Sequence, residues 1–346
     1  VYLLFMGWSL FSFARGVLNA KDYWDWKILL LNYSFSILVP LVVVVGLNHN
    51  IFKESCDFII KKLFLFGFLV IPFSLAIDFE LYARVVVAIG LFILFLPYVG
   101  IRWRLLIMLV AITSVFMDVS YRMNTIRILV AFCILSFFIF RNFFTKNIFN
   151  ILAVIIFCFP LIFLALGVYG QFNVFVDNPL DFSVKTGNIR ELSDTNLAAD
   201  TRTFLYQEVF YSMIQKDSSF VIGEGGGSAY KSYWFSDLEL NDRGRYGSEV
   251  GFLNALLYSG VLGVIFYALM LFIAVYYGIN KSNNYLCKML SIFIASHWLF
   301  FFIEDITKLD LNYYFIWLSI GLCLSNKFRS LNDFEIKSFF KLNGKY

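Results

Sequence analysis

Long apolar segments separated by short polar connections recur along nearly the whole chain. A helix needs about 20 apolar residues to cross roughly 30 Å of hydrocarbon, and the segments approach or reach that length. The pattern predicts transmembrane helices over 1–18, 27–47, 60–78, 82–98, 103–119, 124–140, 148–169, 249–278, 285–303 and 310–326. Strands of a β-barrel would instead alternate in polarity over short lengths, and such segments are absent. The expected fold class is all-α, a polytopic transmembrane helical bundle of about 10 spans.

One long polar stretch interrupts this pattern and divides the chain. The predicted divisions are 1–169 with spans one to seven, 170–248 as a large loop, 249–326 with spans eight to ten, and 327–346 as a tail. A loop of this size is expected to contain short helices and functional residues. Within it, the sequence predicts a helix over 200–216, which Asp200 or Thr201 can cap. An apolar stripe supports this helix, formed by Phe204, Val209, Phe210 and Met213.

The composition agrees with a membrane protein. Of the 346 residues, 60% are hydrophobic and only 15% are charged, which excludes an ordinary soluble domain. The five cysteines fall in apolar segments or short connections, so no disulfide framework is expected. The first apolar segment can serve as the first span, and we therefore expect no separate cleavable signal peptide.

The distribution of basic residues predicts the orientation. Every second connection is basic, and these residues are Lys53, Lys61, Lys62, Arg102, Arg104, Arg141, Lys146, Lys281 and Lys288, followed by five more in the tail. Lysine and arginine accumulate in cytoplasmic loops of membrane proteins. Both termini are therefore expected in the cytoplasm, and the large loop is expected outside.

Several arginines lie on the predicted outer side, where the positive-inside rule predicts few cations. They are Arg15, Arg84, Arg122, Arg127, Arg202, Arg243 and Arg245. Guanidinium groups suit phosphate oxygens, so an anionic ligand at the outer leaflet would explain them. Contacts with lipid headgroups, or ion pairs with Asp78, Glu80 and Asp118, are the alternative. On an uninterrupted helix Arg122 and Arg127 point about 140° apart, so both can face one site only if the turn separates them.

A carboxylate and a glycine cluster lie beside the eighth span. If the helix starts near Tyr246, Glu249 lies on one face with Phe252, Leu256, Gly260 and Gly263. The turn "GEGGGS", which contains Gly223 and Gly225, can bring backbone N–H groups close to a ligand. The alternative for Glu249 is a residue that marks the water boundary and stabilises the helix N-terminus.

Other ionisable residues are weaker candidates. His297 lies within a predicted span and is expected to be packed and hydrogen-bonded, whereas Glu304 and Asp305 near its outer end are open to a site role. Two acidic pairs could bind a metal or be solvated loop residues, namely Asp22 with Asp25 and Asp237 with Glu239. The sequence contains no HExxH, Walker or cysteine–histidine pattern, so we expect no metal and no cofactor.

Four features in this order resemble the superfamily of O-antigen polymerases and O-antigen ligases. They are an outer "YR" turn at Arg122 (or Arg127), Arg202 at the start of a loop helix, the turn with Gly223 and Gly225, and Glu249 before "GFLNALLYSGVLG". The general architecture covers nearly the whole chain, and the motifs cover about 200–265 and the turn near 122. The resemblance implies a metal-independent glycosyltransferase on the outer face of the bacterial cytoplasmic membrane.

The resemblance also implies the substrate and the roles of residues. The donor would be a glycan on undecaprenyl pyrophosphate, and the acceptor a sugar hydroxyl. Arg202 with Arg122 or Arg127 would bind the pyrophosphate, helped by Arg243, Arg245, Gly223 and Gly225, and Glu249 would be the general base. Ligases of this group typically have histidine where Glu249 stands, so a polymerase is favoured. Membrane lipids, a flippase and a chain-length regulator are the expected partners, and no nucleic acid is expected.

Four other functions are alternatives to the polymerase. An O-antigen ligase would transfer finished chains, and a transferase using polyprenyl monophosphate would need an acidic pair better than Asp22 with Asp25. A polysaccharide or lipid transporter should show repeats with interrupted helices at matching positions, and the sequence shows no such repeat. A scaffold without enzymatic activity would leave the outer arginines unexplained.

Overall fold

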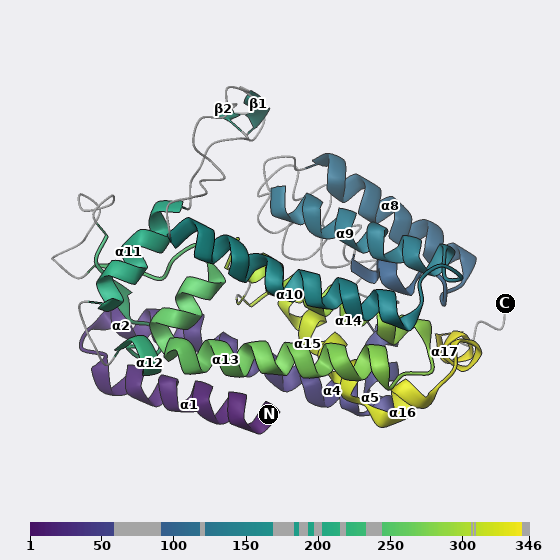
Figure 1. Ribbon diagram of the computed structural model, residues 1–346, viewed down its shortest axis with the longest axis horizontal. Helices are drawn as coiled ribbons and strands as arrows, with labels where there is room; N and C mark the ends of the chain where they lie inside the picture. The colour runs from purple at the N-terminus through teal and green to yellow at the C-terminus, as the bar shows by residue number, and fades with distance from the viewer. Residues whose placement is uncertain are drawn as a thin grey trace.

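The computed structural model describes residues 1–58, 91–117, 122–168, 183–186, 193–196, 203–214, 219–232, 244–305, 307 and 309–340. These residues form a predominantly helical fold (Figure 1), which confirms the predicted all-α class. Two short antiparallel pairs of strands are also present. They are β1 (Ser183–Thr186) with β2 (Ser193–Asn196), and β3 (Ala229–Tyr230) with β4 (Arg245–Tyr246).

Most predicted spans coincide with a helix to within a few residues. The helices are α1 (Tyr2–Asn19), α8 (Ile101–Met117), α9 (Arg122–Ile139), α10 (Lys146–Val168), α13 (Gly251–Asn280), α14 (Tyr285–Phe301) and α15 (Leu311–Leu324). Among the described residues, two helices are long and apolar enough to cross a membrane, Tyr23–Leu47 and α13, and several others are shorter and apolar. The predicted spans 60–78 and 82–98 lie outside the described residues, except that Leu91–Phe95 forms a 3₁₀ helix, η4. The count of about ten spans stays a prediction.

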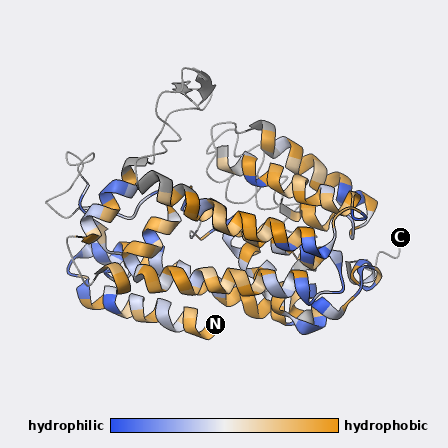
Figure 2. Cartoon of the chain, in the orientation of Figure 1, coloured by the Kyte–Doolittle hydropathy of each residue, from blue (hydrophilic) through white to orange (hydrophobic). Residues whose placement is uncertain are grey.

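Apolar surface follows the helices over most of their length. Figure 2 shows hydrophobic residues along the long helices and hydrophilic ones gathered toward their ends. Large apolar side chains remain exposed on the outer helices, for example Leu3 (81%) and Leu18 (84%) on α1. Because such exposure is costly in water, these faces fit contact with lipid or another apolar surface. At the centre, α13 packs against α1, α10, α14 and α15.

The helix over Tyr23–Leu47 is irregular. It consists of α2 (Tyr23–Ile28), a π-helical turn η1 (Leu29–Tyr33), α3 (Ser34–Leu38), a 3₁₀ turn η2 (Val39–Val42) and α4 (Val43–Leu47). Asp22 and Asp25 form a capping box at its start, in which Asp22 accepts from the backbone N–H of Trp24 and Asp25 at 2.8 and 3.1 Å. Both acids therefore help to start the helix.

The predicted helix of the large loop is confirmed. It is α11 (Thr203–Ile214), and Val209 and Met213 of its apolar stripe are fully buried. A shorter helix, α12 (Ser219–Ile222), follows and packs against α13. The remaining described helices are α5 (His49–Phe58), α16 (Asn326–Ser330) and α17 (Asp333–Phe340).

The expectation that one helical face carries Glu249, Phe252, Leu256, Gly260 and Gly263 is wrong. The helix begins at Gly251, and its N-cap Val250 is extended, so Glu249 precedes it. The reason is a competing pair of hydrogen bonds, because Ser248 N–H donates to Asn254 Oδ1 at 2.6 Å and Asn254 Nδ2 donates to Ser248 O at 2.9 Å. Gly260 also leaves the helical conformation, with φ 65° and ψ −172°.

Gly260 is the position where a methyl group should be most damaging to stability. A Cβ there would clash with the carbonyl of Val221 and lie 2.5 Å from Gly223 N, in a backbone conformation that is essentially restricted to glycine. We expect Gly260→Ala to lower the free energy of unfolding by about 2–5 kcal/mol. Thermal unfolding in detergent measures this. Gly7→Ala is the control, since a Cβ at Gly7 meets no atom within 4 Å; equal stability of the two variants would contradict the account.

Candidate functional site

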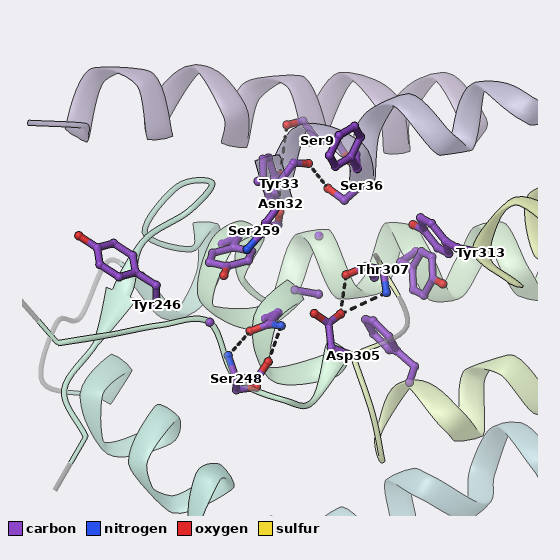
Figure 3. A pocket seen from close by; sticks show the side chains of 18 of the residues that line it. Ser9, Asn32, Tyr33, Ser36, Tyr246, Ser248, Ser259, Asp305, Thr307 and Tyr313 are labelled. Carbon is purple, nitrogen blue, oxygen red and sulfur yellow. Dashed lines mark hydrogen bonds between the residues drawn. The ribbon is translucent and has the colours of Figure 1, made fainter. Parts of the chain in front are cut away.

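A cavity of about 510 Å³ lies between the N-terminal helices and the start of α13. One side, here the N-terminal wall, comprises Ser9 of α1, Asn32 and Tyr33 of η1, and Ser36 of α3. Figure 3 shows these residues across the cavity from Ser248, Asp305 and Thr307. The opposite side, here the charged wall, comprises Arg245, Glu249 and Asp305. Segments more than 200 residues apart in the sequence therefore form one site.

Backbone and side-chain hydrogen bonds hold the charged wall in place. Asp305 N–H donates to Glu249 O at 2.6 Å, and Gly251 N–H donates to Glu304 O at 3.1 Å. Tyr246 OH donates to Asp25 Oδ1 at 2.7 Å and so ties this stretch to the N-terminal region. These bonds explain why the chain between β4 and α13 is extended.

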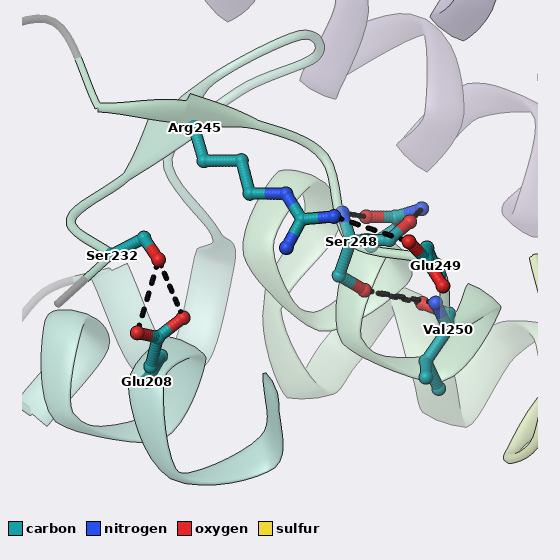
Figure 4. A network of polar contacts seen from close by, with 7 residues as sticks. Glu208, Ser232, Arg245, Ser248, Glu249 and Val250 are labelled. Atoms are coloured by element: carbon teal, nitrogen blue, oxygen red, sulfur yellow. Dashed lines mark hydrogen bonds and ion pairs between the residues drawn. The ribbon is translucent and has the colours of Figure 1, made fainter. Parts of the chain in front are cut away.

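Arg245 and Glu249, both predicted from the sequence as site residues, meet at this cavity (Figure 4). Arg245 Nη2 lies 3.3 Å from Glu249 Oε1, and the two side chains are 24% and 55% exposed. An ion pair this exposed adds little to folding stability. The pair therefore leaves a guanidinium and a carboxylate accessible at the cavity, where both could contact a ligand.

A buried polar network continues from Arg245 into the large loop. Burial raises the pKa of Tyr230 to about 12, although the neighbouring Arg245 guanidinium opposes that shift. Glu208 of α11 is buried, and Ser232 Oγ lies 2.8 and 3.0 Å from its two carboxylate oxygens (Figure 4). A buried carboxylate needs such a donor. The network fixes α11 to the strand pair that carries Arg245.

Asp305 is the second carboxylate of the cavity. Its Oδ1 accepts from Thr307 N–H at 3.1 Å and from Thr307 Oγ1 at 2.6 Å (Figure 3). These two bonds fix the orientation of the carboxylate. Asp305 therefore lines the cavity, where it could act as a site residue. The neighbouring Glu304 instead forms an ion pair with Arg127.

Arg127 lies away from the large cavity. It is 8% exposed and forms an ion pair with Glu304 at 2.8 Å, and it lines a small cavity of about 20 Å³ with His297 and Asp310. His297 is buried, and its Nε2 lies 2.8 Å from Tyr267 OH, which confirms the expected packed and hydrogen-bonded histidine. Tyr267 also lines the large cavity and so connects the two.

The structure describes only some of the other arginines that the sequence predicts at the site. Helix α9 begins at Arg122 and includes Arg127, so no turn separates the two positions in the chain. The side chain of Arg122 lies outside the description, as do Arg84, Arg202 and Arg243. Arg15 donates to Ile222 O at 2.8 Å and so holds α12 against α1. Binding of pyrophosphate by Arg202, Arg243, Arg122 or Arg127 stays a prediction.

The glycine turn packs against helices. The N–H groups of Glu224, Gly225 and Gly226 donate to Leu257 O (2.7 Å), Tyr258 O (3.1 Å) and Ser12 O (2.8 Å). A Cβ on Gly226 would overlap the ring of Tyr33, so the close approach predicted for these glycines is to protein atoms. Neither Gly223 nor Gly225 lines the large cavity, and their role in binding pyrophosphate stays a prediction.

Metal and redox groups are not indicated within the described part of the chain. There, no cluster of three or more His, Cys, Asp or Glu could hold a metal ion. Four cysteines are described there as free thiols, Cys133, Cys158, Cys287 and Cys323, and the expected lack of a disulfide framework stays a prediction.

Together, the fold and the cavity define a helical protein with two candidate membrane-spanning helices and a polar cavity beside the start of one of them. Comparisons with protein-family models, with curated proteins and with solved structures found no match.

Proposed function

We propose that the protein is a polysaccharide polymerase of the bacterial cytoplasmic membrane. It joins oligosaccharide repeat units carried on undecaprenyl pyrophosphate into O-antigen or capsular polysaccharide on the outer face. The observation that supports this best is the meeting of Arg245 and Glu249 at a cavity of about 510 Å³, beside the start of the membrane-span candidate α13. The volume lies within the range of about 300–1,000 Å³ typical of ligand pockets.

The proposed glycosyl transfer needs a guanidinium and a carboxylate, which Arg245 and Glu249 supply. An acceptor hydroxyl attacks the anomeric carbon of the donor glycan, the new C–O bond forms, and the bond to the pyrophosphate oxygen breaks. The lipid pyrophosphate leaves with the bonding electron pair, and a guanidinium stabilises its charge. Glu249 takes the hydroxyl proton as general base. Arg245, which lines the cavity, is proposed to stabilise the leaving pyrophosphate. The resemblance to the polymerase superfamily adds Arg202 in the same role.

One structural observation favours a transporter as the second candidate. Transporters often bind substrate where helices are interrupted near the cavity. Here α13 is broken at Gly260, and the other candidate span contains the π-helical turn η1, which lines the same cavity. A transporter for lipid-linked glycan would use the cavity for passage and catalyse no bond formation.

The surface-polysaccharide ladder of the parent cell, compared with a cell lacking this gene, tests the proposal. A polymerase predicts that the ladder collapses to core bearing a single repeat unit. Bare core with long chains on the lipid carrier would indicate a ligase. Repeat units retained on the inner leaflet would indicate a transporter, and an unchanged ladder would contradict all three.

A chelator should leave a reconstituted reaction unaffected. The proposed mechanism stabilises the leaving pyrophosphate by arginine and routes no step through a metal. We expect the initial rates with and without EDTA to differ by less than about twofold. Clear inhibition that added divalent cation reverses would contradict this mechanism.

A further inference from the structure

The two sides of the cavity differ in charge. The N-terminal wall carries neutral hydroxyl and amide groups, from Ser9, Asn32, Tyr33 and Ser36. The charged wall carries two carboxylates and one guanidinium, so the described lining has one more acidic than basic group. A negatively charged ligand deep in the cavity would be repelled by this lining. Away from the Arg245 guanidinium, the cavity is therefore better suited to a neutral or cationic ligand than to pyrophosphate.

Asn32 offers an amide to such a ligand. It lies in the π-helical turn η1, and π-turns within α-helices occur frequently at functional sites. Its side chain is exposed at the cavity and forms no hydrogen bond with the described residues. An amide of this kind can donate and accept at the same time, which matches a sugar hydroxyl.

Asp305 offers an acceptor from the opposite side. Thr307 occupies Oδ1, whereas Oδ2 accepts no hydrogen bond from the described residues. The carboxylate is thus fixed through one oxygen and can use the other for a ligand hydroxyl.

Tyrosine rings form part of the remaining surface. Tyr33, Tyr258, Tyr267 and Tyr313 line the cavity and are all less than a tenth exposed. The hydroxyl of Tyr33 is engaged by Ser9 O and Ser259 Oγ at 3.2 Å each, and that of Tyr267 by His297 at 2.8 Å. For these two residues the ring is therefore the part left for a ligand. Aromatic surface with a few placed polar groups suits the apolar face and the hydroxyls of a sugar ring.

We propose that the cavity binds a sugar ring of the acceptor glycan between Asn32 and Asp305, and that it selects neutral or amino sugars over acidic ones. This inference rests on the proposed function and adds the substrate class of the site. The reacting hydroxyl then points to Arg245 and Glu249 of the charged wall, where the donor binds in the proposed mechanism.

Binding of the free acceptor tests this directly. The probe is the single repeat unit released from its lipid carrier, titrated calorimetrically into purified full-length protein. We expect Asn32→Ala and Asp305→Asn each to weaken binding at least about tenfold, because each removes a hydrogen bond to the ligand from a charged or well-placed group. Asn50→Ala is the matched control, because Asn50 is exposed on α5 and lies outside the cavity.

Kinetics separate recognition from chemistry. Both variants should raise the KM for acceptor at least about tenfold, with the KM for donor changed less than twofold. Asn32→Asp should weaken the binding of repeat units that contain a uronic acid and strengthen the binding of those with a free amino sugar. The Asn32 side chain makes no hydrogen bond to the described residues, so its variants should fold normally even if Asp305→Asn does not.

Three outcomes would overturn the inference, and they are distinguishable. Wild-type affinity and KM in folded Asn32→Ala, with polymer still formed, would remove the sugar site and leave the polymerase intact. A cell whose ladder is unchanged by loss of the gene would remove the proposed function itself. Tighter binding of uronic acid than of neutral units by wild-type protein would contradict the predicted selectivity.

Discussion

Replacement of Arg245 by alanine should lower the rate of polymer formation about 100-fold or more. Arg245 lines the cavity beside Glu249, and removing one preorganised group that stabilises a developing negative charge typically costs about 10²–10³ in kcat. Arg245→Lys should recover only part of this rate, since an ammonium cannot form the bidentate contact of a guanidinium. The measurement is the initial rate of ladder formation in reconstituted membranes.

Lys231→Ala is the control for Arg245→Ala, because it removes the same charge from an exposed residue next to β3. It should retain the wild-type rate. The network around Tyr230 and Glu208 borders Arg245, so thermal unfolding of each variant must accompany the rate. A folded Arg245→Ala protein with a normal rate would place the pyrophosphate at another arginine, with Arg202 the next to change.

Replacement of Glu249 by glutamine should lower the rate about 10²–10⁴-fold, the usual contribution of a general base. Its side chain is more than half exposed, so the change should leave the fold intact. The same substitution at Glu54, an exposed residue of α5, is the matched control. Asn254 is unsuitable for comparison, because it is buried and closes the turn at Ser248.

The dependence of the rate on pH distinguishes two roles of Glu249, catalysis as a general base and positioning of Arg245. Loss of a general base should remove the acidic limb of the profile in Glu249→Gln, whereas loss of a positioning contact would lower the rate equally at all pH values. A rate reduced less than about fivefold, with an unchanged profile, would instead make Glu249 a boundary residue.

The helices could be predicted from the sequence because apolar length and periodicity are local properties. The helix α11, for example, follows from its apolar stripe, and Val209 and Met213 of that stripe are buried, whereas the predicted cap at Asp200 or Thr201 lies outside the described residues. The start of α13 could not be predicted from the same pattern. Ser248 and Asn254 compete for the first helical hydrogen bonds, and the 304–305 segment binds Glu249 and Gly251 by their backbones.

Part of the candidate site was also readable from the sequence. Arg245 and Glu249 stand four residues apart before an apolar segment, and the structure joins them at the cavity. The pairing of Asn32 with Asp305 could not be predicted from the sequence, because no local pattern indicates that the two residues line one cavity. The glycine turn illustrates the reverse, since its close approach is to Tyr33 and α13.

The central claim, that this protein joins lipid-linked repeat units, is tested most directly by reconstitution. Purified protein in liposomes would receive undecaprenyl-pyrophosphate-linked repeat units extracted from the cell lacking the gene, and products would be separated on a gel. The account predicts a ladder of increasing chain length with wild-type protein and single units with Arg245→Ala. Single units left unchanged by folded wild-type protein would contradict it.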